Sequence, residues 1–261
     1  MKRVILILFT VGFLVIMPPS PSSKGQFGGT FIGVIVADDG IVMGSDSRST
    51  FVDSGGKPVG YVDKMPKIYV KSGAAIAVAG LTSVEDELLS SFIRRNDYLL
   101  NSSVDEILYD VASKLPFRNT TSVLMLSAGL SGGKPMICAK APIEPQSCRK
   151  SGYLTNKSSP GLRRWFDSRH GHVGTVAEAS VALEKAIREA TDLDTTIGGP
   201  ITLLQFSNAG NSQWLQNPPN DNGWTRVCDI VDAYRKGRIP IFFTDTKEGL
   251  DGYLAGVCPR S

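Results

Sequence analysis

The chain has 261 residues, of which 42% are hydrophobic and 20% charged, so it holds enough apolar material for one sizeable core. Three of its 28 basic residues, Lys2, Arg3 and Lys24, precede Thr30, and no acidic residue does. The remainder therefore carries 25 basic and 25 acidic residues, and the net charge of +3 belongs to the leader. With no basic run or aromatic–basic stripe, the composition argues against nucleic-acid binding.

The first 23 residues have the pattern of a signal peptide. A positive start, Met1-Lys2-Arg3, precedes an apolar run at 4–17, and a stretch rich in proline and serine at 18–23 ends it. The apolar run is shorter than the ~20 residues that a membrane-spanning helix needs. We therefore expect a signal peptide at 1–23, a short propeptide at 24–29, and an exported protein, periplasmic or secreted. The alternatives are a membrane anchor formed by residues 4–17 and a buried pro-segment.

The run that begins at Thr30 has the pattern of a β-hairpin. Two apolar stretches flank the turn Asp38-Asp39-Gly40. Thr30 stands at the start of the first expected strand and Asp46 at the end of the second. Because an antiparallel hairpin brings these two ends together, we expect Thr30 and Asp46 to lie close in space.

The rest of the chain predicts alternating groups of strands and helices. Periodicity favours strands at 67–70, 74–79, 122–127, 135–139 and 200–206, and helices at 84–98, 103–115 and 175–190. Residues 53–58 are predicted to form a glycine-rich loop. This order favours sheets packed between helical layers in one domain spanning 30–261. The segment from 208 onward has no interpretation on its own.

Four cysteines, Cys138, Cys148, Cys228 and Cys258, form an even set. The first two bracket a short loop, so a local bridge between them is easy, and the other two would then tie down the C-terminal segment. Four buried thiols are the alternative. The leader favours two disulfides, because exported proteins meet an oxidising environment. Their spacing does not fit a zinc site, and His170-Gly171-His172 is read as a loop, so we expect no metal and no cofactor.

Gly29-Thr30, the turn at 38–40 and the segment Gly44-Ser45-Asp46-Ser47-Arg48 resemble the start of a mature proteasome β-type subunit and of the HslV peptidase. In that family a Gly-Thr bond is cut autocatalytically and the freed threonine is the nucleophile. The resemblance extends to about residue 206. It implies an α+β fold of the N-terminal-nucleophile type, a four-layer αββα sandwich with two antiparallel sheets between helices.

The chemistry of such a threonine explains why the leader matters. A hydroxyl is a poor nucleophile without a base, and a free α-amine with a pKa of about 7.7–8.0 can supply one at physiological pH. While Gly29 is attached, the nitrogen of Thr30 is an amide and cannot act as a base. Cleavage of the Gly29-Thr30 bond would therefore activate the enzyme.

The resemblance also implies roles for residues downstream of the hairpin. Lys64 matches the catalytic lysine, with Lys67 as the fallback, and Asp46 would pair with it. The backbone N–H of Gly80, at the end of a strand, would stabilise the oxyanion.

Further along the chain, Asp194 matches an aspartate that supports the N-terminal amine, but Ile197 occupies a position where the family has serine. Ser158 or Ser159 lies about where another serine is expected, in a poorly matching turn.

These residues predict a self-processing threonine-type peptidase or amidohydrolase that forms an acyl-enzyme on Thr30. We expect a peptide or unfolded-protein substrate, a homo-oligomeric ring, and no ATPase partner for an exported enzyme. One alternative is a catalytically silent subunit with a structural or binding role. Another is a cytosolic peptidase whose first 29 residues are entirely propeptide.

Overall fold

The computed structural model describes residues 26–71, 73–80, 83–84, 86–115, 123–141, 144–218 and 222–259. In this part of the chain the fold is α+β, and each pair of neighbouring strands is antiparallel. Sheet I has the order β13 (Gly152–Thr155), β2 (Ile32–Ala37), β3 (Gly40–Ser45), β14 (Thr202–Ser207) and β15 (Ser212–Gln216). Sheet II has the order β12 (Ser147–Arg149), β11 (Lys134–Lys140), β10 (Leu124–Ser131), β7 (Ala74–Ala79) and β6 (Ile68–Lys71).

Two smaller sheets and the helices complete the described fold. Sheet III has the order β1 (Gln26–Gly28), β4 (Ser49–Val52), β5 (Pro58–Val62) and β16 (Phe242–Phe243), and β8 (Ser83–Val84) pairs with β9 (Glu87–Leu88). The helices are α1 (Leu89–Arg95), the 3-10 helix η1 (Asp97–Asn101), α2 (Ile107–Lys114), α3 (Pro160–Ser168), α4 (Val176–Leu193), α5 (Val227–Arg235) and α6 (Lys247–Val257).

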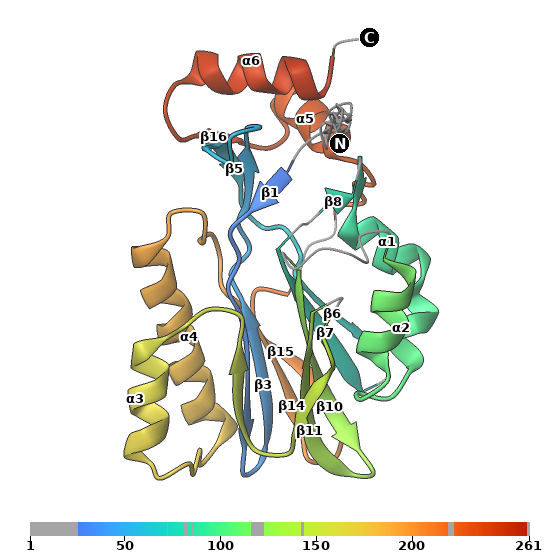
Figure 1. Ribbon diagram of the computed structural model, residues 1–261, viewed down its shortest axis with the longest axis vertical. Coiled ribbons are helices and arrows are strands. Elements are labelled where there is room, and N and C mark those ends of the chain that lie inside the picture. Colours follow the sequence, from blue (N-terminus) through green and yellow to red (C-terminus); the bar gives the residue numbers. More distant parts are fainter. Residues whose placement is uncertain are drawn as a thin grey trace, which may run out of the picture.

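The β2–β3 hairpin is apolar throughout because it is buried on both faces. Ile35 of β2 belongs to the core beneath α4, whereas the adjacent Val34 belongs to a core that also contains Ala77 and Leu126 of sheet II. Alternate residues of a strand point to opposite faces, so one strand serves both cores. Figure 1 shows the hairpin between α3 and α4 on one side and sheet II with α1 and α2 on the other.

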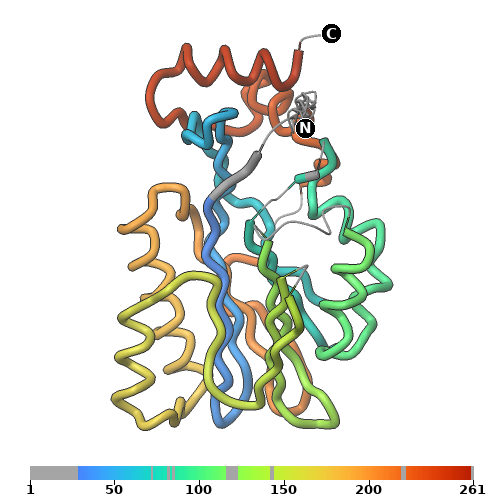
Figure 2. The backbone as a smooth tube through the Cα atoms, viewed as in Figure 1, coloured from blue at the N-terminus to red at the C-terminus, as the bar shows by residue number. Residues whose placement is uncertain are grey.

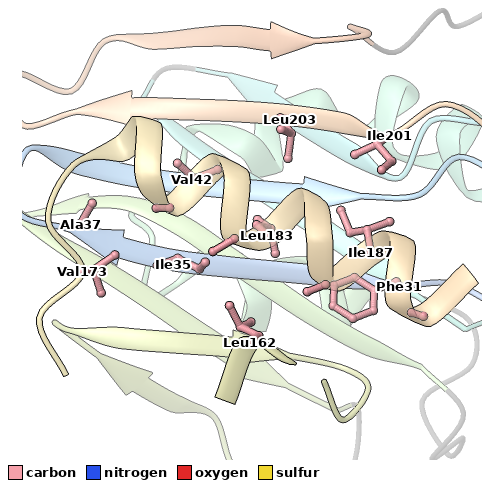
Figure 3. Packing of buried hydrophobic residues seen from close by; sticks show 14 of the residues in the cluster. Phe31, Ile35, Ala37, Val42, Leu162, Val173, Leu183, Ile187, Ile201 and Leu203 are labelled. Atoms are coloured by element: carbon pink, nitrogen blue, oxygen red, sulfur yellow. The ribbon is translucent and has the colours of Figure 1, made fainter. Parts of the chain in front are cut away.

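Helix α4 packs against sheet I through residues spaced by one turn. Ala179, Leu183 and Ile187 recur every four positions and lie over the strands together with Val42 and other buried residues (Figure 3). The helix begins with a complete capping box between Thr175 and Glu178. Burying each leucine or isoleucine of this face contributes roughly 1.5–3 kcal/mol.

The C-terminal segment covers the end of the molecule at which sheet III lies. Helices α5 and α6 share a buried core with β4 and β5, including Phe51, Val62, Ile230 and Leu250. In Figure 2 this segment, drawn in red, lies across the top of the molecule beside the blue β4–β5 turn. The structure therefore differs from the expected arrangement of two sheets alone, since sheet III adds a further layer of strands under α5 and α6.

Several expected elements have different bounds. The helix predicted at 84–98 is split into β9, α1 and η1, and the helix predicted from Ser103 begins only at Ile107. Ser103 and Glu106 have the spacing of a capping box, but no such box forms, because Ser103 Oγ donates to the Glu106 side chain at 2.6 Å and Glu106 is the residue before the helix. The part of the strand prediction at 122 lies outside the described residues.

The two expected disulfides are present, between Cys138 and Cys148 on paired strands and between Cys228 and Cys258 on α5 and at the end of α6. They are the arrangement expected in an oxidising compartment. The residues of the expected signal peptide at 1–23, of the alternative anchor at 4–17 and of the start of the expected propeptide lie outside the described part of the chain. Among the helices that the structure describes, none is long and apolar enough to cross a membrane.

Candidate active site around Thr30

Thr30 and Asp46 lie together at the open end of the β2–β3 hairpin, as the hairpin predicted. Phe31 N donates to Asp46 Oδ1 at 2.8 Å, and Asp46 N donates to Phe31 O at 3.2 Å. Thr30 is 2% exposed, and the Asp46 side chain is fully buried. The register that pairs Ile32 with Ser45 therefore carries the two strand ends into one site.

Asp46 is held by backbone donors as well as by a cation. Its Oδ2 accepts from Arg48 N at 3.1 Å and from Gly198 N at 3.0 Å, while Lys67 Nζ lies 2.9 Å from Oδ1. A buried carboxylate with this many donors is satisfied without water. The loop after α4, which carries Gly198, is thereby fixed to the end of β3.

The lysine that pairs with Asp46 is Lys67, so the expectation that Lys64 fills this place is wrong. Lys67 Nζ also donates to Arg48 O at 2.5 Å, and Lys67 O accepts from Val78 N at 3.1 Å, which extends β6 along β7. Lys64 is exposed, has φ of 69°, and lines a pocket of about 190 Å³ that Ser47 and Asn217 also line. The two residues that separate the lysines, Met65 and Pro66, lie in the loop before β6.

Burial lowers the pKa of the Lys67 ammonium, because a charge without bulk water is disfavoured, and the adjacent Asp46 carboxylate opposes this shift. Asp63 stands close enough to raise the same pKa slightly, and Lys157 close enough to lower it. Asp63 itself is paired with Arg48, whose Nε lies 3.0 Å from Asp63 Oδ1. The site therefore contains a compact set of charges of alternating sign around Lys67.

Asp194 follows α4 and faces a hydroxyl that sequence reasoning missed. The expected serine position holds Ile197, which is buried in the core beneath α4. Thr196, one residue earlier, donates its hydroxyl to Asp194 Oδ1, and its backbone N donates to the same oxygen at 3.0 Å. The one sequence signal for Thr196 was that it carries a hydroxyl directly before Ile197, which stands where a serine was expected.

Thr196 also lies against Gly29. A Cβ added to Gly29 would be 2.0 Å from Thr196 Oγ1, and Gly29 has φ of 75°, so only glycine fits there. Strand β1 leads into this position by pairing with β4, with Gly28 opposite Thr50. Thr30 Oγ1 lies 2.6 Å from Gly29 O, and the hydroxyl is thus beside the carbonyl of the expected processing bond.

The residue of the 156–159 turn that contacts Thr30 is Asn156, not Ser158. Ser158 is exposed, and the contact comes from Asn156, whose Nδ2 donates to Thr30 O and whose Oδ1 accepts from Ile32 N, both at 2.8 Å. Ser159 is instead the N-cap of α3, where its hydroxyl accepts from Leu162 N at 3.2 Å. The asparagine was missed because a single amide gives no pattern in a sequence.

Gly80 directly follows β7, as expected, with φ of 106°. In the described residues, no hydrogen bond joins it to Thr30, so its place as an oxyanion donor stays a prediction. The described part of the chain also contains no cluster of three histidine, cysteine, aspartate or glutamate side chains that could hold a metal. His170 and His172 lie in the turn that follows α3.

No protein-family profile matches the sequence, and neither does any curated protein. Among solved structures, the chain is similar to Anbu, a Gly-1 mutant from Hyphomicrobium sp. strain MC1. The TM-score is 0.55 at 11% sequence identity, over 80% of this chain and 94% of that chain. This likeness shows a shared fold.

The comparisons correct the family assignment that the 29–50 segment suggested. With no family match and 11% identity to Anbu, the chain is not identified as a proteasome β-type subunit or an HslV peptidase. The segment that carried the resemblance is a buried hairpin with a tight turn, and such a hairpin constrains glycine and apolar positions by itself. What remains is a distant relation through the fold.

Proposed function

We propose that this protein is a self-processing threonine-type hydrolase of peptide or other amide bonds, with Thr30 as its nucleophile. The observation that carries the proposal is the contact between Thr30 Oγ1 and Gly29 O at 2.6 Å, together with the buried Lys67–Asp46 pair, whose carboxylate accepts from Phe31 N. A hydroxyl beside a carbonyl, with a buried cation and carboxylate next to the following residue, is an arrangement suited to acyl transfer. Among the charged residues near Thr30, Lys67 takes the role first assigned to Lys64.

Self-cleavage would proceed by transfer of the Gly29 acyl group from nitrogen to oxygen. The Thr30 hydroxyl loses its proton and attacks the Gly29 carbonyl carbon. The C–N bond then breaks, and the nitrogen takes up a proton to become a free amine. Water hydrolyses the resulting ester, which releases Gly29 as a carboxylate and restores the Thr30 hydroxyl.

The processed enzyme would repeat this chemistry on a substrate amide. The α-amine of Thr30 takes the hydroxyl proton, the oxygen attacks the substrate carbonyl, and the amine returns the proton to the leaving group. Lys67 stabilises negative charge near the nucleophile, and the backbone N–H of Gly80 is the proposed donor to the oxyanion. Asp194 supports the amine.

The proposal is tested by the intact mass and N-terminal sequence of the purified protein beside Thr30→Ala. A wild-type chain that begins at Thr30, together with a variant that retains Gly29, is the expected result. If both chains begin near residues 23–24, Thr30 has no free amine and the proposal falls. Thr30→Ser is the matched variant, because it keeps a hydroxyl and should still be cut.

A catalytically silent protein with a structural or binding role is the second candidate. Ile197 favours it, because its side chain is buried in the core and offers no hydroxyl to Asp194. The mass measurement separates the two candidates, since a silent protein would leave the Gly29-Thr30 bond intact.

The two disulfides support export to an oxidising compartment, and an exported enzyme would act on short or unfolded peptides without an ATPase. Processing by a signal peptidase before residue 24 would then precede self-cleavage. Assembly into a ring of identical subunits is part of the proposal and is tested by the molar mass of the processed protein in solution.

A further inference from the structure

Lys157, Asp194 and Thr196 form a cluster beside the Gly29-Thr30 bond. Asp194 Oδ1 accepts from the Thr196 hydroxyl and from Thr196 N, and Asp194 Oδ2 is paired with the Lys157 ammonium. The lysine comes from the loop after β13 and the other two from the loop after α4. Two separate segments thus converge on one carboxylate.

Two contacts connect the cluster with the residues of the Gly29-Thr30 bond. Thr196 Oγ1 occupies the space that a side chain on Gly29 would need, 2.0 Å from its Cβ position. On the other side, Asn156, which precedes Lys157, donates to Thr30 O at 2.8 Å. The cluster therefore lies next to Gly29 through Thr196 and next to Thr30 through the neighbour of Lys157.

We propose that Thr196 and Lys157 are positioning residues for the α-amine of Thr30: the Thr196 hydroxyl fixes the Asp194 carboxylate, and Lys157 balances its charge. This inference rests on the proposed function, because it concerns the amine that cleavage creates. In this arrangement the Thr196 hydroxyl serves in place of the serine expected at position 197. The Lys157 ammonium serves in place of the serine expected at position 158 or 159.

The charge of Lys157 matters because the amine must be neutral to act as a base. The charged groups of this part of the structure form three ion pairs, Asp46 with Lys67, Asp194 with Lys157, and Asp63 with Arg48. An unbalanced Asp194 carboxylate would favour the protonated amine, whereas the Lys157 cation opposes protonation. Removing Lys157 should therefore raise the pKa of the Thr30 amine.

The test measures this amine directly and needs no knowledge of the substrate. Processed wild type, Lys157→Met and Lys157→Arg are acetylated with acetic anhydride over a range of pH, and mass spectrometry follows the Thr30 peptide. Lys185→Met is the matched control, since Lys185 is exposed on α4. We expect the midpoint pH of acetylation of the Thr30 amine to rise in Lys157→Met and to stay unchanged in Lys157→Arg and Lys185→Met. In the double variant Lys157→Met with Asp194→Asn it should return toward the wild-type value.

An unchanged titration in Lys157→Met, or an equal shift in Lys157→Arg, would overturn the inference. If Lys157→Met is not processed but Lys157→Arg is, the need for a cation is supported; failure of both overturns it. For Thr196, serine should preserve processing and valine should slow it at least tenfold, and equal rates would remove Thr196 from the proposal. Absence of cleavage in the wild type would instead refute the proposed function itself.

Discussion

Lys67 Nζ lies 2.9 Å from Asp46 Oδ1, and the two side chains are 1% and 0% exposed. Isolated charges are strongly disfavoured at such a depth, so each depends on the other and on the backbone groups around them. Phe31, Arg48 and Gly198 donate to the carboxylate, and Arg48 O accepts from the ammonium. The pair therefore joins the start of β2, the end of β3, the start of β6 and the loop after α4.

Lys67→Met should abolish self-cleavage and destabilise the protein by about 3–5 kcal/mol, because it leaves the buried Asp46 carboxylate without its cation. The three backbone donors that remain favour the lower end of this range. Lys64→Met is the control, since Lys64 is exposed and makes no ion pair among the described contacts. Urea unfolding gives the stability and intact mass the cleavage; a cleaved, fully stable Lys67→Met would contradict the assignment.

Much of the site could be predicted from local patterns, because a hairpin fixes its own geometry. Thr30 and Asp46 are joined by two strands and a turn, so their proximity follows from sequence alone. The choice between Lys64 and Lys67 could not be made in this way, because it depends on which of the two side chains contacts Asp46 in the folded chain. Lys67 reaches Asp46 and Arg48 O, which lie 21 and 19 residues earlier in the chain, and no local pattern fixes such a contact.

The same limit applies to the rest of the fold. Helix α4 was predicted nearly to its ends from its apolar spacing, which is a local signal. Strands β4 and β5 and helices α5 and α6 were not predicted. The two strands are short and share a core with these helices, which come from a distant part of the chain, whereas the spacing of Val227, Ile230 and Val231 in α5 is a helical pattern that was overlooked.

Gly29→Ala should slow self-cleavage at least tenfold although the nucleophile is intact. The added Cβ would meet Thr196 Oγ1 at 2.0 Å, and the left-handed φ of 75° disfavours any residue other than glycine, at a cost of about 1–3 kcal/mol. The rate is followed by intact mass after refolding. Gly29→Ala combined with Thr196→Gly, compared with Thr196→Gly alone, separates the two causes, because it removes the contacts with Oγ1 and Cβ of residue 196 but leaves the backbone strain at position 29.

Asp194 should make the folded state sensitive to acid. Burial alone would raise the pKa of its carboxyl, but hydrogen bonds from Lys157 and Thr196 outweigh burial and lower the pKa below the ordinary 3.8. The unfolded state then binds the proton more readily, so this contribution to stability is complete above pH 3.8 and is lost as the pH falls through the lower folded-state pKa.

The Asp194 expectation is checked by urea unfolding of wild type, Asp194→Asn and Asp192→Asn between pH 2 and pH 6. The free energy of unfolding should fall less steeply below about pH 4 in Asp194→Asn than in the wild type. Asp192→Asn is the matched control, because Asp192 is exposed on the last turn of α4. Parallel curves for wild type and Asp194→Asn would show that Asp194 is not held by this cluster.

The two disulfides should differ in how much they stabilise the fold. Cys228 and Cys258 are 30 residues apart, whereas Cys138 and Cys148 are 10 apart. In the chain-entropy description a longer loop constrains the unfolded chain more, which gives about 3.6 kcal/mol for the first bridge and about 2.7 kcal/mol for the second. Replacing both cysteines of a pair by alanine and measuring urea unfolding tests the order.

The Cys228–Cys258 bridge should also decide whether the C-terminal segment stays in place. Its two helices cover Phe51 and Val62, which belong to the strands that lead to and from the site. Loss of the bridge should therefore increase hydrogen exchange in β4 and β5 more than in β2 and β3, which α4 and sheet II cover. Equal exchange in both hairpins after Cys228→Ala and Cys258→Ala would show that the segment is held by packing alone.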